Sequence, residues 1–328
     1  MRIVVTGSLA YDYIMNFPGS FRDHILPEKT HMLTVSFLVD SMRRMRGGVA
    51  GNIAYTLALL EERPLVVASA GQDFADYRRW MDAQGIDTSG ITEIADEFTA
   101  SCFINTDMHN NQILAFYPGA TTHSRNLSLR EFDLGPDDFV VISPTDPEAM
   151  SRHAAECREL GVPFLFDPGK QTPRLEGEQI LEGLRGAQVL VSNDYEFAMM
   201  AQKTGRSEAE LIASTPLTVV TRGEEGSILY TADMPDGLHI PIAPVREVVD
   251  PTGAGDAYLG GLVFGIAHHY PLPVAGRIGA LAAAYAVEER GCQEHRYTIQ
   301  EFVERYTEAF GASDAVESLL KEEASAKQ

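Results

Sequence analysis

The chain has 328 residues, of which 45% are hydrophobic and 22% charged, so it can bury a large core and has the composition of an ordinary folded protein. Its 47 acidic residues outnumber its 26 basic ones and give a net charge of −21. Such a surface repels nucleic-acid backbones and anionic membranes, so neither is expected as a partner. The three cysteines lie far apart without C-x-x-C spacing, which predicts reduced thiols and a cytoplasmic protein.

Short apolar runs alternate with helical patterns along most of the chain. It opens with a strand pattern from Arg2 to Val5 in place of a signal peptide, and no apolar run reaches transmembrane length. The expected core strands are Ile3–Thr6, Leu65–Ala70, Phe139–Ile142, Phe164–Asp167, Val189–Ser192, Thr218–Thr221 and Ser227–Thr231. The expected helices are Asn52–Leu60, Phe74–Gln84, Pro147–Leu160, Asp194–Gln202, Ala257–His269 and Val274–Glu289. This alternation predicts an α/β fold with a parallel sheet covered on both faces.

Two regions and the C-terminal tail depart from this pattern. Residues 12–39 and 98–117 are extended with polar alternation, and the turn composition of residues 107–112 predicts an antiparallel hairpin in the second region. The tail from Ser313 is rich in Ala, Glu, Lys and Ser. Residues 313–328 are therefore expected to fray, and we assign them no function.

The stretch from Asp250 to Asp256 is the most specific motif of the chain. Two glycines flank Ala254 just before an apolar helical run, so backbone N–H groups and the positive end of a helix dipole can face a bound phosphate. Asp256 would repel that phosphate, but it is suited to take a proton from a hydroxyl that attacks phosphorus. A glycine turn with an aspartate N-cap is the alternative reading.

Polar residues near the N-terminus suit recognition of neighbouring hydroxyls. Gly47 and Gly48 permit close backbone approach before a helix, and Asn52 can both donate and accept hydrogen bonds. Asp12 follows a strand end, which is the usual place for a ligand group in an open α/β sheet. A capped loop and a turn aspartate are the corresponding structural alternatives.

Two further motifs follow strand ends in the second half of the chain. Asn193 and Glu196 share one helix face, where Glu196 would hold Mg²⁺ through water, although N-x-x-E is also a helix capping box. Thr221, Gly223 and Gly226 offer a hydroxyl and backbone amides to phosphate oxygens, and they equally suit a tight turn into the next strand. The chain has no G-x-x-x-x-G-K-[ST] motif, so a P-loop enzyme is excluded.

Together these motifs resemble the ribokinase-like (PfkB) family of sugar and nucleoside kinases. Residues 250–256 are similar to its C-terminal signature, 47–52 to its N-terminal di-glycine signature, 193–196 to its N-x-x-E motif, 221–226 to its T-x-G-x-x-G loop, and 7–12 to its first strand with a substrate-binding Asp. The motifs keep the order and spacing of the family from about residue 3 to about residue 292. Such agreement over nearly the whole chain is hard to reconcile with a chance match.

The resemblance implies a three-layer α/β/α fold with a mostly parallel central sheet, formed by residues 1–312. A small β-sheet lid would come from about residues 12–39 and 98–118. ATP would be the phosphate donor and Mg²⁺ the cofactor. K⁺ is a further candidate, because some relatives bind a monovalent cation at the loop that corresponds to residues 289–293, beside Asp250.

The resemblance also assigns site residues. Asp256 would be the general base, and the N–H groups of Gly253, Ala254 and Gly255 would form an anion hole. The substrate-binding residues would be Ser8, Asp12, Gly47, Gly48 and Asn52, and the nucleotide-binding residues Asn193, Thr221, Gly223 and Gly226, with Asn193 and Glu196 near Mg²⁺. Gly169 departs from the family, which often has Asn there. Lys170 is a candidate for a positive charge near the phosphates, although a solvated loop lysine is the commoner case.

The sequence constrains the identity of the phosphate acceptor less than any other feature of the predicted reaction. Phe37 and the lid residues Phe103 and Phe116 offer flat apolar surface on which a nucleobase would stack, unless they are simply lid core. Residues 291–298 make the chain most similar to bacterial adenosine-kinase-like members, which implies adenosine phosphorylated at its 5′ hydroxyl. A ribokinase- or fructokinase-like sugar kinase is the alternative, and a non-catalytic nucleoside- or sugar-binding regulator is a third. Relatives occur as monomers or as homodimers paired through the lid, and both remain open.

Overall fold

The computed structural model describes residues 1–25, 34–109 and 111–326, with the backbone alone for 321–326. Within these residues lie a nine-stranded and a four-stranded sheet. The larger sheet has the strand order β13-β12-β11-β10-β9-β8-β1-β4-β5. Its strands are β1 Ile3–Thr6, β4 Leu65–Gly71, β5 Ile91–Ile94, β8 Phe139–Ile142, β9 Phe164–Phe166, β10 Val189–Asn193, β11 Leu217–Thr221, β12 Ser227–Thr231 and β13 Met234–Ile240.

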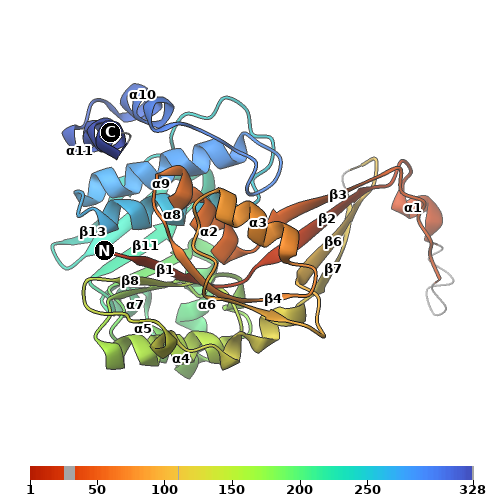
Figure 1. The fold of residues 1–328 in the computed structure, drawn as a ribbon, viewed down its shortest axis with the longest axis horizontal. Helices are drawn as coiled ribbons and strands as arrows, with labels where there is room; N and C mark the ends of the chain where they lie inside the picture. The colour runs from red at the N-terminus through yellow and green to blue at the C-terminus, as the bar shows by residue number, and fades with distance from the viewer. Residues whose placement is uncertain (26–33, 110, 327–328) are drawn as a thin grey trace.

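All neighbouring strands from β11 to β5 are parallel, and β12 and β13 extend the sheet as antiparallel strands. Helices cover both faces and bury two apolar clusters against them (Figure 1). One face carries α2 Val49–Leu59, α3 Ala75–Ala83, α8 Ala254–Ala267, α9 Leu272–Val287, α10 Ile299–Phe310 and α11 Asp314–Ala326. The other carries α4 Pro147–Leu160, α5 Gly177–Leu184, α6 Asp194–Thr204 and α7 Glu208–Ile212. The expected three-layer α/β/α fold is confirmed.

Local sequence explains why α4 begins and ends where the helical pattern predicts. Asp146 caps its N-terminus by accepting hydrogen bonds from the N–H groups of Glu148 and Ala149, and Pro147 occupies the first helical position. Gly161 ends the helix with φ 68°, a conformation that glycine adopts without strain. The Asp146 side chain is thereby held at the edge of the sheet.

The four-stranded sheet projects from the core as the expected lid (Figure 1). Its order is β3-β2-β6-β7, with β2 Ala10–Asn16, β3 Ser41–Gly47, β6 Ala100–Thr106 and β7 Gln112–Tyr117. The predicted hairpin β6–β7 is confirmed, but β3 lies beyond the predicted boundary at residue 39. Its polar run with two Arg-Met pairs has no strand-like apolar alternation. Part of the predicted lid segment, residues 26–33, falls outside the described residues.

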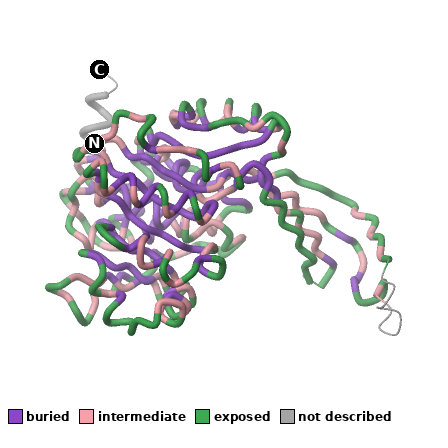
Figure 2. Tube along the Cα trace, turned by 90° about the horizontal axis from the view of Figure 1, so that it is seen from below, coloured by how far each residue is buried: buried purple, intermediate pink, exposed green. Residues whose placement is uncertain are grey.

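The lid is less buried than the rest of the molecule, because β3 and β7 are mostly exposed and β2 and β6 mostly half-buried (Figure 2). The C-terminal tail was expected to fray, but residues Asp314–Ala326 form α11, whose Val316 and Leu319 are buried beside α10. Two apolar residues three apart on one helix face suffice to dock a short amphipathic helix. None of the helices described here is long and apolar enough to span a membrane.

Candidate active site

Three adjoining cavities lie at the edge of the large sheet where its parallel strands end, the usual place for a ligand in this architecture. The first cavity has about 370 Å³ and lies between the lid strands, the start of α2 and the loops after β1, β8 and β9. The second has about 230 Å³ and is bounded by the ends of β9 to β11 and the start of α8. The third, of about 130 Å³, lies between the β11–β12 turn, α8 and α9.

The start of α8 carries the motif that the sequence analysis ranked first. The helix begins at Ala254 and not at Ala257, so Asp256 stands in its first turn. Gly253 caps it with φ 82°, and a Cβ at that position would stand 2.9 Å from the Cys292 Sγ, so glycine is required on both counts. The N–H groups of Gly255 and Asp256 have no partner within the helix, whereas that of Ala254 donates to the Pro251 carbonyl at 3.3 Å.

Asp256 lines the second cavity and is joined to the first through Asn52. The Asn52 Nδ2 group donates to the Asp256 Oδ2 atom at 2.7 Å, and Asn52 itself lines the first cavity. Burial raises the pKa of Asp256 to about 6, against the Asn52 hydrogen bond and the charge of Lys170, which both lower it, while the charge of Glu196 raises it. A carboxylate with a pKa near neutrality is well matched to taking a proton at physiological pH.

The glycines of the N-terminal motif make room for their neighbours. A Cβ on Gly47 would stand 2.9 Å from the Asp12 Oδ2 atom. Gly48 has φ 89°, and a Cβ there would stand 2.6 Å from the backbone of residues 8 to 10. The Ser8 hydroxyl accepts a hydrogen bond from the Val49 N–H at 3.2 Å and thereby holds the loop after β1 against the start of α2.

Strand register decides which lid side chains face the first cavity. Asp12, Cys102 and Phe116 are paired across β2, β6 and β7, and all three line the cavity. Phe103 lies one residue further along β6, so it points to the opposite face, where it stacks on Tyr13 at 4.9 Å between ring centroids. This placement does not support the predicted contact of Phe103 with the substrate, because Phe103 lies away from the first cavity and Phe116 lines it.

Phe37 also lies away from the cavities. Its ring packs against Phe17 at 5.1 Å and Phe21 at 4.7 Å, next to α1 Phe21–His24 at the far end of the lid (Figure 1). The structural alternative, lid core, is the correct reading of this residue.

Lys170, for which the sequence left two interpretations open, lies where the first and second cavities meet. It lines both the first and the second cavity, in the short 3₁₀ turn Gly169–Gln171 that follows β9. Burial is the largest influence on the pKa values of Asp12, Glu196 and Asp256, and it raises all three. The charge of Lys170 acts in the opposite direction and lowers them. Lys170 is exposed, as expected of a loop lysine, and its charge nevertheless acts on carboxyl groups of both cavities.

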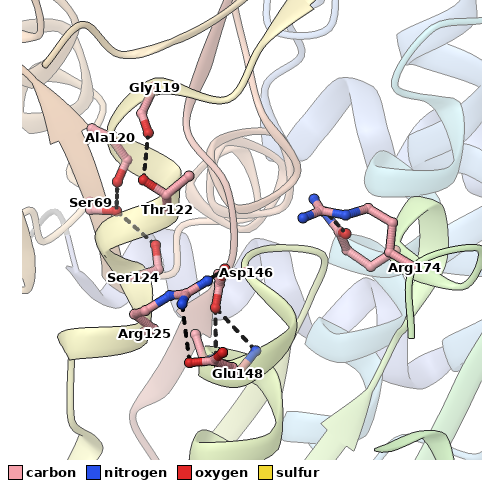
Figure 3. A network of polar contacts seen from close by, with 11 residues as sticks. Ser69, Gly119, Ala120, Thr122, Ser124, Arg125, Asp146, Glu148 and Arg174 are labelled. Carbon is pink, nitrogen blue, oxygen red and sulfur yellow. Dashed lines mark hydrogen bonds and ion pairs between the residues drawn. The ribbon is translucent and has the colours of Figure 1, made fainter. Parts of the chain in front are cut away.

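A network of polar contacts forms part of the lining of the first cavity (Figure 3). Arg125 donates to the buried Asp146 carboxylate at 2.7 Å, and Asp146 also caps α4. The Thr122 hydroxyl donates to the Gly119 carbonyl at 3.1 Å. Arg174 reaches towards this network from the segment after β9, and it donates to the Gln171 side chain at 3.3 Å. Asp146 and Arg174 line the same cavity, and no motif signalled either of them.

Asn193 and Glu196 form the capping box that was their structural alternative. The Asn193 Oδ1 atom accepts from the Glu196 N–H at 2.7 Å, and the Glu196 Oε2 atom accepts from the Asn193 N–H at 3.1 Å. Both still line the second cavity, together with Asp167, whose pKa burial and the nearby Glu196 and Asp256 raise. Among the described residues, no three His, Cys, Asp or Glu side chains converge on one metal position. The acidic lining therefore suits a hydrated Mg²⁺ and not a fully protein-ligated ion.

The T-x-G-x-x-G loop lies where the second and third cavities meet. Thr221 lines both, whereas Gly223 and Gly226 line the third. Gly226 has φ 85°, and a Cβ there would stand 2.2 Å from the Ile240 carbonyl oxygen, so the loop is a tight turn as well as a cavity wall. The two readings of this motif are compatible.

Comparison with known proteins agrees with this arrangement. Residues 3–298 match the model of the pfkB family of carbohydrate kinases. A nucleoside kinase of Methanocaldococcus jannaschii is 31% identical over 306 residues, which cover 93% of this chain and 96% of that protein. The structure of a Burkholderia thailandensis nucleoside kinase in complex with inosine is 36% identical and superposes with a TM-score of 0.83 over 95% of this chain and 99% of that one.

A second complex of the Burkholderia enzyme, with ADP and inosine, is 38% identical, with a TM-score of 0.82 over 95% of this chain and 97% of that chain. Ribokinase of Thermotoga maritima, at 21% identity and a TM-score of 0.74 over 98% of this chain and 99% of that one, shares the fold. The family match spans all five sequence motifs and the three cavities that they line. The chain therefore belongs to the pfkB family of carbohydrate kinases and is a phosphotransferase.

Proposed function

We propose that this kinase transfers the γ-phosphate of ATP to a primary hydroxyl of a nucleoside, with the 5′ hydroxyl of adenosine as the favoured acceptor and Asp256 as general base. One observation carries the proposal. Asp256 lines the second cavity, and its hydrogen-bond partner Asn52 lines the first, so a single 2.7 Å contact connects an acceptor space with a phosphate space. Proton removal and phosphate transfer need such proximity.

The proposed chemistry uses the chain's own groups on both sides of this contact. Asp12, in the first cavity, offers two oxygens to vicinal hydroxyls of the ribose. Asp256 accepts the proton of the attacking hydroxyl, and the Asn52 N–H group favours its ionised form. The backbone N–H groups of Gly253 and Gly255 stabilise charge that develops on the transferred group, and that of Ala254 joins them only if it leaves the Pro251 carbonyl. Lid closure over the first cavity excludes water as a competing nucleophile.

Lys170 and the acidic lining share the handling of phosphate charge. Lys170 lies between the two cavities, where its ammonium group would meet the transferred phosphate. Mg²⁺, when bound with the nucleotide, would neutralise charge on the phosphates. Asn193 and Glu196 would hold it through water, because each already accepts a hydrogen bond within the capping box.

The acceptor is inferred from the first cavity and from the relatives. A cavity of about 370 Å³ suits a small molecule, and Phe116 gives it an apolar wall on which a base can stack. The Methanocaldococcus and Burkholderia relatives named above are nucleoside kinases, and the Burkholderia enzyme is described in complex with inosine. Adenosine is favoured over inosine only by the similarity of residues 291–298 to adenosine-kinase-like members, so the two nucleosides need a direct comparison.

The test measures ADP release from ATP and Mg²⁺ with adenosine, inosine, other nucleosides, ribose, fructose and fructose phosphates offered separately. The highest kcat/KM is expected with adenosine. Turnover with a sugar alone would overturn the acceptor and retain the mechanism. Measurable binding of nucleosides without any turnover would instead support a non-catalytic regulator.

A homodimer formed through the lid is the accompanying proposal for the assembly. The lid face opposite the first cavity exposes three large apolar side chains, namely Met42, Phe103 and Ile113. An exposed apolar sheet surface of this kind is typical of an interface. Light scattering that gives the mass of one chain at micromolar concentration would contradict it.

A further inference from the structure

A buried chain of hydrogen bonds runs from the base of the lid to Asp256. The Tyr77 hydroxyl donates to the Gly47 carbonyl at 3.0 Å. The Gln293 Nε2 group donates to the Tyr77 oxygen at 2.5 Å and to the Asn52 Oδ1 atom at 2.7 Å. Asn52 in turn donates to Asp256 at 2.7 Å. Tyr77, Gln293 and Asn52 are all buried, so bulk water does not compete for these bonds.

The chemistry of the Gly47 end fixes the direction of every bond in this chain. A backbone carbonyl can only accept, so the single hydroxyl proton of Tyr77 is committed to Gly47. The Tyr77 oxygen must then accept, which requires the Gln293 amide to present its nitrogen. With both N–H groups of Gln293 donating, Asn52 presents Oδ1 to Gln293 and is left with Nδ2 facing Asp256.

The alternative orientation of the Asn52 amide would place Oδ1 against the carboxylate. Two acceptors in contact at that distance repel each other, and the ionised base would lose its donor. Asn52 alone does not choose between the two orientations, because its amide can rotate by half a turn within nearly the same volume. The ionised carboxylate, which can only accept, favours the donating orientation. Gln293, whose own orientation comes from Tyr77, holds the amide in that orientation also when the carboxyl group is protonated. Gln293 holds this orientation although its Oε1 atom has no partner among the described residues.

We propose that Tyr77 and Gln293 are positioning residues that orient the Asn52 amide so that it donates to the catalytic base. This inference rests on the proposed role of Asp256 as that base. Neither residue touches the reacting atoms, and neither lines the first or the second cavity. Their effect reaches Asp256 only through Asn52.

The same chain ties the base to the lid. Gly47 is the last residue of β3, and the loop that carries Gln293 also lies directly against this strand at two places. Arg46 forms an ion pair with Glu294 at 3.6 Å, and a Cβ on Gly291 would stand 2.4 Å from the Met45 methyl group. The orientation of Asn52 is therefore set only while the end of β3 stands where Tyr77 can reach it.

Tyr77→Phe removes the hydroxyl and keeps the ring, and Tyr55→Phe is its matched control. Tyr55 is equally buried, but its hydroxyl donates at 2.6 Å to the His295 carbonyl, outside the chain of bonds. Tyr77→Phe is expected to lower kcat about three- to tenfold, the range for one net hydrogen bond, with the KM for nucleoside and ATP within about twofold of the native values. Tyr55→Phe is expected to leave kcat within about twofold.

A double-mutant cycle separates positioning from a general structural effect. In an Asn52→Ala background there is no amide to orient, so adding Tyr77→Phe is expected to change kcat by less than about twofold. Gln293→Met, of similar volume but without donors, is expected to behave as Tyr77→Phe does and serves if that variant does not fold. An equal kcat loss in both backgrounds, or a raised KM with unchanged kcat, would overturn the proposal.

The experiments distinguish a failure of the proposed function from a failure of the positioning role. Near-native turnover by Asp256→Asn would refute the role of the base itself. An inactive Asp256→Asn combined with an unchanged kcat of Tyr77→Phe and Gln293→Met would overturn only the positioning role.

Discussion

Replacing Asn52 with Leu should move the acidic limb of the kcat–pH profile upwards. Native turnover is expected to rise with pH through a midpoint near the Asp256 pKa of about 6. The Asn52 N–H group stabilises the ionised carboxylate through a 2.7 Å hydrogen bond, whereas burial and the charge of Glu196 act against it. A hydrogen bond to a charged group contributes about 1.5–3 kcal/mol, which corresponds to roughly one to two pKa units.

With the donor gone, the midpoint is therefore expected between about pH 7 and 8. Turnover at pH 6 would fall roughly fifteenfold relative to the native enzyme for a shift of about 1.5 units, and turnover at pH 9 would stay within about twofold. Steady-state kcat at saturating nucleoside and MgATP, measured from pH 5 to 9, gives both midpoints. A variant profile that is lower at every pH but keeps the native midpoint would refute the reasoning, because Asn52 would then act on something other than the carboxylate.

Three further substitutions test neighbouring claims. Asp256→Asn should lower kcat by about 10²–10⁴ in the assay of ADP release. The same change should raise Tm above pH 6. Burial raises the Asp256 pKa to about 6, so the free-energy cost of ionising this carboxyl in the folded protein, up to about 3 kcal/mol, develops between about pH 4 and 6. A gain in Tm that persists below pH 4 would contradict this. Lys170→Met should raise the KM for ATP roughly tenfold or more, with partial recovery in Lys170→Arg. Gly253→Ala should lower the free energy of unfolding by about 1–3 kcal/mol in urea titrations, because φ is 82° and the Cys292 Sγ atom stands 2.9 Å from the new Cβ.

Motifs that lie on the backbone could be predicted from the sequence. The strands Ile3–Thr6, Phe139–Ile142 and Ser227–Thr231 and the helix Pro147–Leu160 have the predicted bounds, because apolar runs, caps and turns are local. Gly253 and Asp256 stand at the start of a helix, as their pattern indicated, although the helix begins three residues earlier. Local spacing was enough for each of these predictions.

Side-chain partners that depend on register or on distant segments could not be predicted. Phe103 and Phe116 look alike in sequence, and only the pairing of Cys102 with Phe116 decides that the second one lines the cavity. Lys170 is exposed like an ordinary loop lysine, and only the two cavities that meet at its turn mark it as a candidate site residue. Contacts between residues separated by more than a hundred positions leave no periodic trace in a single sequence.

The chain from Gly47 to Asp256 is the clearest case of this limit. Asn52 and Gln293 are 241 positions apart, and Asn52 and Asp256 are 204 apart. The residue types are informative once they are placed together, because a carbonyl at one end and a carboxylate at the other admit a single direction of donation. Sequence alone provides the groups and not their order.

The second cavity has an acidic lining, as the chain has a net charge of −21, and Lys170 is one cationic side chain among its lining residues. Burial raises the pKa values of Asp167, Glu196 and Asp256. Neighbouring carboxylates raise them further, namely Glu196 and Asp256 for Asp167, Glu196 for Asp256 and Asp194 for Glu196, so the fold holds acidic groups at a free-energy cost. That cost is relieved when a cation enters, and ATP brings Mg²⁺ with its phosphates. Free ATP, in contrast, would add negative charge to a site in which Lys170 is the cation shared with the acceptor cavity. We therefore expect the acidic lining to favour the metal-bound nucleotide over the free one. Burial also leaves Asp256 less acidic than an exposed aspartate, which suits its proposed role as a base near neutral pH.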